Sequence, residues 1–154
     1  VVFCYAPGRG KERAAARLVG SPGILQCDGY ATYKALAAKG MMLAFCCSHA
    51  RREFYDLAKG GAAPIVEEAL QRVTAFYAID SDIRGRSAKV RWTARQARSR
   101  PLVEDLFAWL AASGTLPGGS PTAQAIRYAL NHRDGLVRFL DDGRVCLSNN
   151  AAER

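Results

Sequence analysis

The hydrophobic pattern of this chain changes character near residue 60. Before that point, short apolar runs that are typical of buried strands alternate with stretches of helical composition. The predicted strands are residues 1–5, 24–28 and 41–47, and the predicted helices are residues 11–19, 29–40 and 48–61. This alternation is typical of an α/β fold. Ser48 is expected to cap the third of these helices, and Gly60–Gly61 is expected to end it.

The next 75 or so residues carry a different, helical pattern. Apolar side chains recur every three or four positions in three stretches, residues 64–85, 99–114 and 120–140. Pro121 stands where a proline is accepted in the first turn of a helix. Residues 141–148 then predict a turn at Asp141–Asp142 and a short strand. The sequence therefore divides into an α/β portion over 1–60, a helical portion over 61–140 and a return over 141–154.

The chain is strongly basic. Its 154 residues include 22 Lys and Arg against 14 Asp and Glu, which gives a formal net charge of +8. A basic domain suits a polyanionic partner such as nucleic acid, although charge also serves solubility, and the two interpretations stay open. No apolar run reaches the ~18 residues of a membrane span, and no basic stretch precedes the first apolar run, so no signal peptide is expected. We therefore predict no membrane segment and a cytoplasmic location.

The five cysteines predict reduced thiols. They are odd in number and form no Cys-x-x-Cys pair, which favours an intracellular protein over a disulfide framework. Cys46 and His49 have a spacing that would suit zinc, but no second ligand pair is visible and the other histidine is His132. The favoured interpretation places Cys46 in the core, with His49, Arg51 and Arg52 facing an active site or DNA.

Two carboxylates are candidates for metal chemistry. Asp28 ends an apolar strand and precedes Gly29, a position where α/β proteins gather ligands, although Asp-Gly is also a common turn. Glu153 lies three residues after Asn150, which is the capping-box spacing of a helix start. The chain stops one residue later, so we expect the rest of that helix, and residues before Val1, to be missing. If the two acids converge, their hard oxygens would suit Mg²⁺.

A basic stretch runs from residue 84 to residue 100 and holds seven Lys or Arg residues and no acid. Arg84, Arg91, Arg95 and Arg98 are predicted to share one helical face, where they could bind DNA phosphates or remain a solvated basic surface. Trp92 is favoured as a core anchor for this helix, with base stacking as the alternative.

Four blocks of the sequence, residues 24–36, 45–58, 98–110 and 125–154, resemble the transposases of the insertion sequence 66 family, in the same order. These are bacterial enzymes of the DDE class with an RNase H-like catalytic core. The resemblance implies that Asp28 is the second metal-binding acid and Glu153 the third, with Mg²⁺ or Mn²⁺ as cofactor. No residue here matches the first acid, which lies on an earlier strand in the family. The core is therefore expected to be incomplete, with residues 61–140 as a helical insertion.

The implied activity is metal-dependent cleavage and strand transfer of DNA at the ends of a mobile element. The expected partners are DNA, further copies of the chain or other element-encoded proteins, at the bacterial nucleoid. The side chains expected to contact DNA are His49, Arg51, Arg52, Arg84, Arg91, Arg95, Arg98, Asn150 and Arg154, with Asn149 shaping the helix start. Two alternatives stay open: a non-catalytic, DNA-binding remnant of a transposase, and an RNase H-like nuclease without strand transfer.

Overall fold

The computed structural model describes residues 18, 23–29, 33, 40–61, 63–113 and 119–150. Its strands are β1 (Ile24–Cys27) and β2 (Met42–Phe45), followed by α3 (Cys47–Lys59), α4 (Pro64–Asp82), α5 (Ala88–Ala94), a π-helical turn η1 (Arg95–Ser99), α6 (Arg100–Ala112), α7 (Pro121–Asn131), α8 (Arg133–Leu136) and α9 (Arg138–Asp141). Parallel strands among helices agree with the predicted α/β class. The predicted strand over 1–5 and helices over 11–19 and 29–40 lie outside the described residues, apart from Leu18, Gly29, Tyr33 and Gly40.

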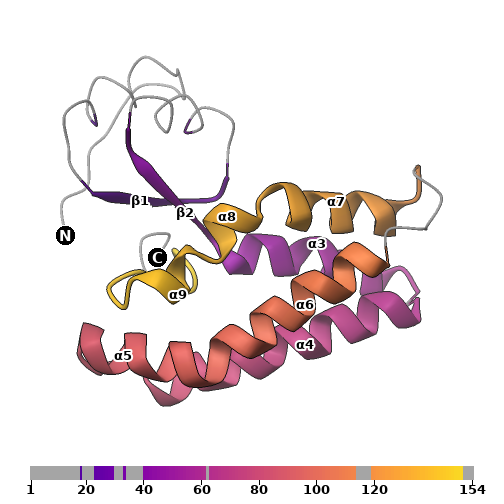
Figure 1. Cartoon of the computed structure of the whole chain (residues 1–154). Helices are drawn as coiled ribbons and strands as arrows, with labels where there is room; N and C mark the ends of the chain where they lie inside the picture. The colour runs from indigo at the N-terminus through magenta and orange to yellow at the C-terminus, as the bar shows by residue number, and fades with distance from the viewer. Residues whose placement is uncertain are drawn as a thin grey trace.

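The two strands form a small sheet at one end of the molecule (Figure 1). They pair in parallel, with Ile24 opposite Met42 and Cys27 opposite Phe45. The amide of Cys46 donates to the carbonyl of Cys27 at 2.9 Å and carries the pairing one residue further. Because the strands are parallel, the residues that follow β1 and β2 lie at the same edge of the sheet.

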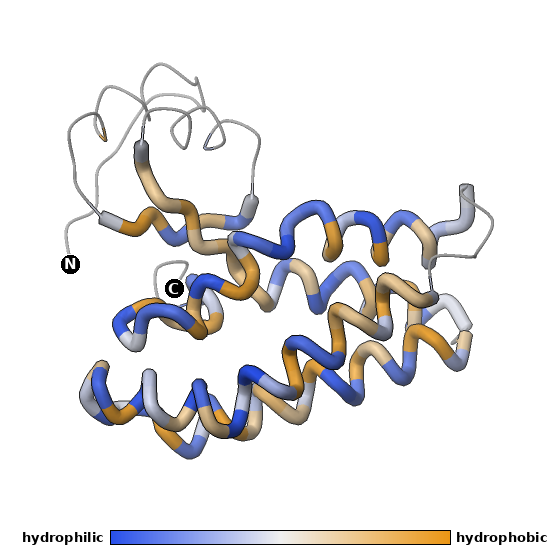
Figure 2. Tube along the Cα trace, in the orientation of Figure 1, coloured by the Kyte–Doolittle hydropathy of each residue, from blue (hydrophilic) through white to orange (hydrophobic). Residues whose placement is uncertain are grey.

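The helices form two packed layers beside the sheet. In Figure 1, α4 and the continuous α5–η1–α6 rod run antiparallel, and α3 and α7 lie above them. The apolar residues of these helices recur among hydrophilic ones along each tube in Figure 2, as expected for helices that bury one face. Phe54, Phe76, Leu110, Ile126 and Leu140 are among the buried side chains that join α3, α4, α6, α7 and α9 in one core. No helix of the described part of the chain has the length and apolar character needed to cross a membrane.

The helix ends mostly follow the sequence signals. Gly60 follows the last residue of α3, and Ser120 caps α7 by accepting a hydrogen bond from the amide of Ala123 at 3.1 Å, with Pro121 in the first turn. The predicted cap at Ser48 is wrong. The helix begins at Cys47 instead, since the extended backbone of Cys46 already leads out of the strand, and the Ser48 hydroxyl lies 3.0 Å from that of Tyr77.

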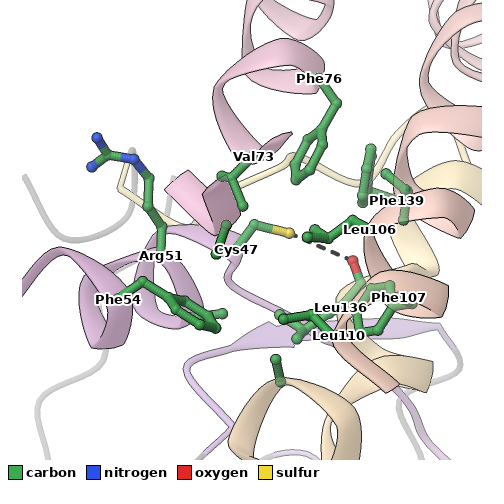
Figure 3. Close-up of a pocket in the computed structure, with 14 residues that line it drawn as sticks. Cys47, Arg51, Phe54, Val73, Phe76, Leu106, Phe107, Leu110, Leu136 and Phe139 are labelled. Carbon is green, nitrogen blue, oxygen red and sulfur yellow. Dashed lines mark hydrogen bonds between the residues drawn. The ribbon is translucent and has the colours of Figure 1, made fainter. Parts of the chain in front are cut away.

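A small cavity of about 40 Å³ lies inside the apolar core (Figure 3). Cys47, Phe76, Leu106 and Leu136 are among its lining residues, and the guanidinium of Arg51 points away from it. The thiol of Cys47 donates to the carbonyl of Leu136 at 3.5 Å, and burial raises the pKa of this thiol far above its ordinary value. The cavity is therefore an apolar packing defect beside a buried thiol, and it is much smaller than a typical ligand pocket.

The other described cysteines are also free thiols. Cys27 and Cys46 are buried, which confirms the core position predicted for Cys46, whereas Cys146 is exposed. Cys4 lies outside the described residues.

We use the term return segment for residues 142–147, whose structure differs from the prediction. Residues 142–150 contain neither helix nor strand, so the strand predicted within 141–148 is wrong. Its carbonyls accept bonds from three separate elements instead: from Gln26 Nε2 to Cys146 at 2.6 Å, from the Cys47 amide to Leu147 at 3.0 Å, and from Arg95 Nη1 to Val145 at 2.8 Å. These bonds satisfy the backbone without a strand partner.

The predicted turn near Asp141–Asp142 exists in a different form. Asp141 is the last residue of α9, and the carboxylate of Asp142 accepts the amide of Arg144 at 2.8 Å. This is a local side-chain turn, without the two strands of a hairpin among the described residues. The hydrogen bonds from Arg144 also lower the pKa of Asp142.

Replacing Gly143 with alanine is expected to destabilise the fold. Gly143 is buried, and a Cβ there would lie 1.9 Å from the carbonyl oxygen of Ala88, so α5 and the return segment would have to separate. Overpacking of this kind costs about 1–3 kcal/mol of the free energy of unfolding, which urea denaturation measures. Gly119→Ala is the control, because a Cβ at Gly119 meets nothing within 4 Å. Equal midpoints for the two variants would contradict the close contact.

Candidate active site at the carboxyl edge of the sheet

Asp28 lies where the sequence places it, immediately after β1. It is exposed, and Gly29 follows with a φ of +86°, a backbone conformation that glycine adopts without strain. Cys46 follows the neighbouring strand β2 at the same edge, and α3 begins there with its first-turn amides. The strand pairing thus presents one exposed carboxylate beside the start of a helix.

The described residues supply only part of a metal site. A carboxylate oxygen is the ligand that Mg²⁺ prefers, and Asp28 provides one. Glu153 and Arg154 lie outside the described residues, and among the residues that the structure does describe no three of His, Cys, Asp or Glu gather as a metal ligand set. The zinc interpretation of Cys46 and His49 gains no further ligand from the described part of the chain. Asp28 therefore fits a hard divalent cation as one ligand of a set that other segments would have to complete.

Two aromatic side chains that the sequence analysis did not connect to Asp28 lie against it. The hydroxyl of Tyr128 donates to the main-chain carbonyl of Asp28 at 3.3 Å. His132, one turn later, stacks on the ring of Tyr128 with centroids 4.2 Å apart and contacts the ring edge of Phe45 at 5.4 Å. Their spacing of four residues is typical of one helical face, but no sequence pattern links α7 to a strand 100 residues earlier.

The histidine and arginines at the start of α3 have different environments. His49 is half-buried in the first turn of α3, and its amide donates to the carbonyl of Cys46 at 3.2 Å. The guanidinium of Arg51 lies 5.3 Å over the ring of Tyr55, whereas Arg52 is exposed. A contact of any of these residues with DNA stays a prediction.

The basic face predicted over residues 84–98 is wrong at Arg95. This side chain is 0% exposed, and its guanidinium donates to Asp80 Oδ1 at 3.1 and 2.5 Å and to the carbonyls of Phe139 and Val145 at 2.9 and 2.8 Å. Arg95 therefore belongs to the core and is unavailable to DNA. The π-helical turn η1 changes the register of the helix at this point. The acid that pairs with Arg95 belongs to α4 and lies outside residues 84–100.

The other residues of that stretch differ in how exposed they are. Arg91 is half-buried and donates to the carbonyl of Val145 at 3.1 Å, while Arg98 is exposed and pairs with Asp82 at 2.9 Å. Trp92 is 46% exposed, so the prediction that it anchors the helix in the core is wrong. We use the term basic end for the exposed cations around α5, which are Arg84, Arg86, Lys89 and Arg98.

The family model described as "Transposase IS66 family" matches the chain over residues 1–154. The chain belongs to this IS66 transposase family. Three similar proteins of Sinorhizobium fredii (strain NBRC 101917 / NGR234) carry the names uncharacterized protein y4qI, y4jD and y4hP, with identities of 39%, 38% and 36%. The alignments cover 100%, 100% and 99% of this chain and 30%, 32% and 31% of those proteins. No solved structure shows significant similarity to the chain.

Membership in the IS66 family confirms the resemblance drawn from the four sequence blocks. The family gives the chain a transposase-related function. The IS66-family chain spans about a third of the length of the curated relatives it matches. What the whole protein does, which metal it binds and which DNA it contacts are therefore proposals.

Proposed function

We propose that the chain is part of a DDE-type DNA transposase catalytic domain that cleaves DNA at the ends of a mobile element and joins them to target DNA. The observation that supports this proposal most directly is the exposed carboxylate of Asp28 at the carboxyl end of a parallel strand, in a chain that the IS66 family model matches throughout. In this proposal, residues 1–60 and 141–154 belong to an RNase H-like core, and residues 61–140 form its helical insertion.

Asp28 and Glu153 would hold the metal, together with a first acid that no residue of this chain matches. Bound Mg²⁺ or Mn²⁺ would stabilise the charge that develops on the attacking and leaving oxygens of the phosphodiester. The protein's own part is to fix the carboxylates and the DNA strand relative to each other, since positioning provides much of the rate in phosphoryl transfer.

DNA would lie along the edge of the sheet, where His49, Arg51 and Arg52 project from α3 and Asn150 follows the return segment. Asn149 would shape the helix start that precedes Glu153, and Arg154 would bind a phosphate. The basic end around α5 offers a second, separate set of cations for the DNA backbone. Arg95 is excluded from this surface because its guanidinium is buried and paired. We place the activity at the bacterial nucleoid, with self-association or other element-encoded proteins completing the assembly.

The test uses the protein expressed from the complete reading frame that encodes this chain, with a plasmid carrying the element's ends and a target plasmid. We expect Mg²⁺-dependent nicking at the ends followed by joining to the target, both scored on gels and by junction sequencing. Cleavage without any joined product would identify a nuclease instead. DNA binding that persists without cleavage in Mg²⁺ or Mn²⁺ would identify a non-catalytic remnant.

A further inference from the structure

The corner between α7 and α8 lies against the strand end that carries Asp28, although it belongs to the helical portion of the chain. We propose that Tyr128, supported by His132, is a positioning residue that fixes the main chain of Asp28 and so orients its carboxylate. This inference rests on the proposed function, because it assigns Tyr128 a role toward the metal-binding acid. It also gives the helical insertion a direct part in the site.

The first support is the hydrogen bond itself. The hydroxyl of Tyr128 donates to the main-chain carbonyl of Asp28 at 3.3 Å, and this bond joins α7 to the residue that follows β1. The packing around Gly29 agrees with it. An ideal Cβ on Gly29 would lie 3.4 Å from the Tyr128 hydroxyl and 3.4 Å from His132 Cδ2, so both side chains lie beside this turn with room for about one carbon atom between.

The second support is the way in which Tyr128 is itself held. His132 Nδ1 lies 2.8 Å from the carbonyl of Tyr128, and because a carbonyl oxygen can only accept, Nδ1 donates this hydrogen bond. The His132 ring stacks on Tyr128 and meets the edge of Phe45, the last residue of β2. The contacts therefore run from β2 through two rings to the carbonyl of Asp28, and they restrict the rotamer of Tyr128.

The hydrogen bond reaches the backbone of Asp28 and not its carboxylate. Tyr128 can therefore fix the position of the residue without occupying the side-chain oxygens that the proposed function assigns to the metal.

Tyr128→Phe tests the inference, because it removes the hydroxyl and keeps the stacked ring. The readout is Mn²⁺ affinity, measured by calorimetry on the protein from the complete reading frame, together with the Mg²⁺ concentration that gives half-maximal cleavage. We expect both to weaken by about 2- to 10-fold, the range for loss of one hydrogen bond, while the melting temperature changes little. Tyr55→Phe is the matched control, because Tyr55 is an exposed tyrosine on α3.

The outcomes separate this inference from the proposed function. Weaker Mn²⁺ binding by Tyr128→Phe, with Tyr55→Phe equal to the parent, supports the positioning role. If the parent binds Mn²⁺ through Asp28 and Tyr128→Phe binds it equally well, the inference is overturned and the proposed function stands. If Asp28→Asn leaves Mn²⁺ binding unchanged, the metal site at Asp28 fails and the inference fails with it.

Discussion

Asp28→Asn, made in the protein from the complete reading frame, is expected to reduce Mg²⁺-dependent cleavage at the element's ends by about 10³-fold or more. Asparagine has nearly the same shape as aspartate but brings no negative charge to a divalent cation. The loss would correspond to several kcal/mol of charge stabilisation in the transition state. The bond from Tyr128 would be retained, since it reaches the main-chain carbonyl. Single-turnover cleavage rates provide the measurement.

The control for this variant is Asp56→Asn. Asp56 is an exposed aspartate on α3 whose partner is Lys59, at 3.2 Å, and it has no place in the proposed site. We expect Asp56→Asn to cleave like the parent and both variants to bind DNA with nearly unchanged affinity. Cleavage by Asp28→Asn at the parent's rate would show that the reaction does not use Asp28, and the proposed site would have to be abandoned.

Arg95→Met is expected to lower the free energy of unfolding by about 3–5 kcal/mol, as for other buried ion pairs that lose one partner. Methionine would fill much of the space of the arginine stem, so the loss comes chiefly from polar groups. The carboxylate of Asp80 would lose its cation, the carbonyl of Phe139 would lose its donor from Arg95, and the carbonyl of Val145 would keep only Arg91. Urea denaturation of the chain followed by circular dichroism measures the change.

Two further variants show whether the loss comes from burial. Arg98→Met removes a guanidinium that is half exposed and pairs with Asp82 across the surface, so we expect a change within about 1 kcal/mol. Combining Arg95→Met with Asp80→Asn should recover part of the stability, because the unpaired charge is then removed as well. Similar losses for Arg95→Met and Arg98→Met would contradict a role of Arg95 in the core.

The parts of the fold that local chemistry determines could be predicted from sequence. The helical spacing over residues 64–85 and 99–114, the stop at Gly60 and the first-turn proline at Pro121 each depend on neighbours within a few positions. The place of Asp28 at a strand end follows from the same kind of local pattern. These features agree with the structure because they depend little on distant parts of the chain.

The errors have a common physical cause, which is pairing across long separations in sequence. Residues 141–148 predict a turn and a short strand, but the carbonyls of Val145, Cys146 and Leu147 bond to groups on three other elements. Arg95 is predicted to join a basic, DNA-binding helical face because residues 84–100 contain no acid, whereas Asp80 of α4 pairs with it. Tyr128 was missed because its partner carbonyl lies 100 residues earlier.

The buried arginine also constrains the order in which the chain can fold during its synthesis. Asp80 leaves the ribosome before Arg95, but the carbonyls of Phe139 and Val145 follow it by 44 and 50 residues. Helices α4 and α6 are therefore both synthesised while the guanidinium of Arg95 still lacks those acceptors and remains partly hydrated. Closing loops of this length costs conformational entropy before the contacts repay it. The helices made first therefore stay loosely packed until residues synthesised several seconds later complete the core.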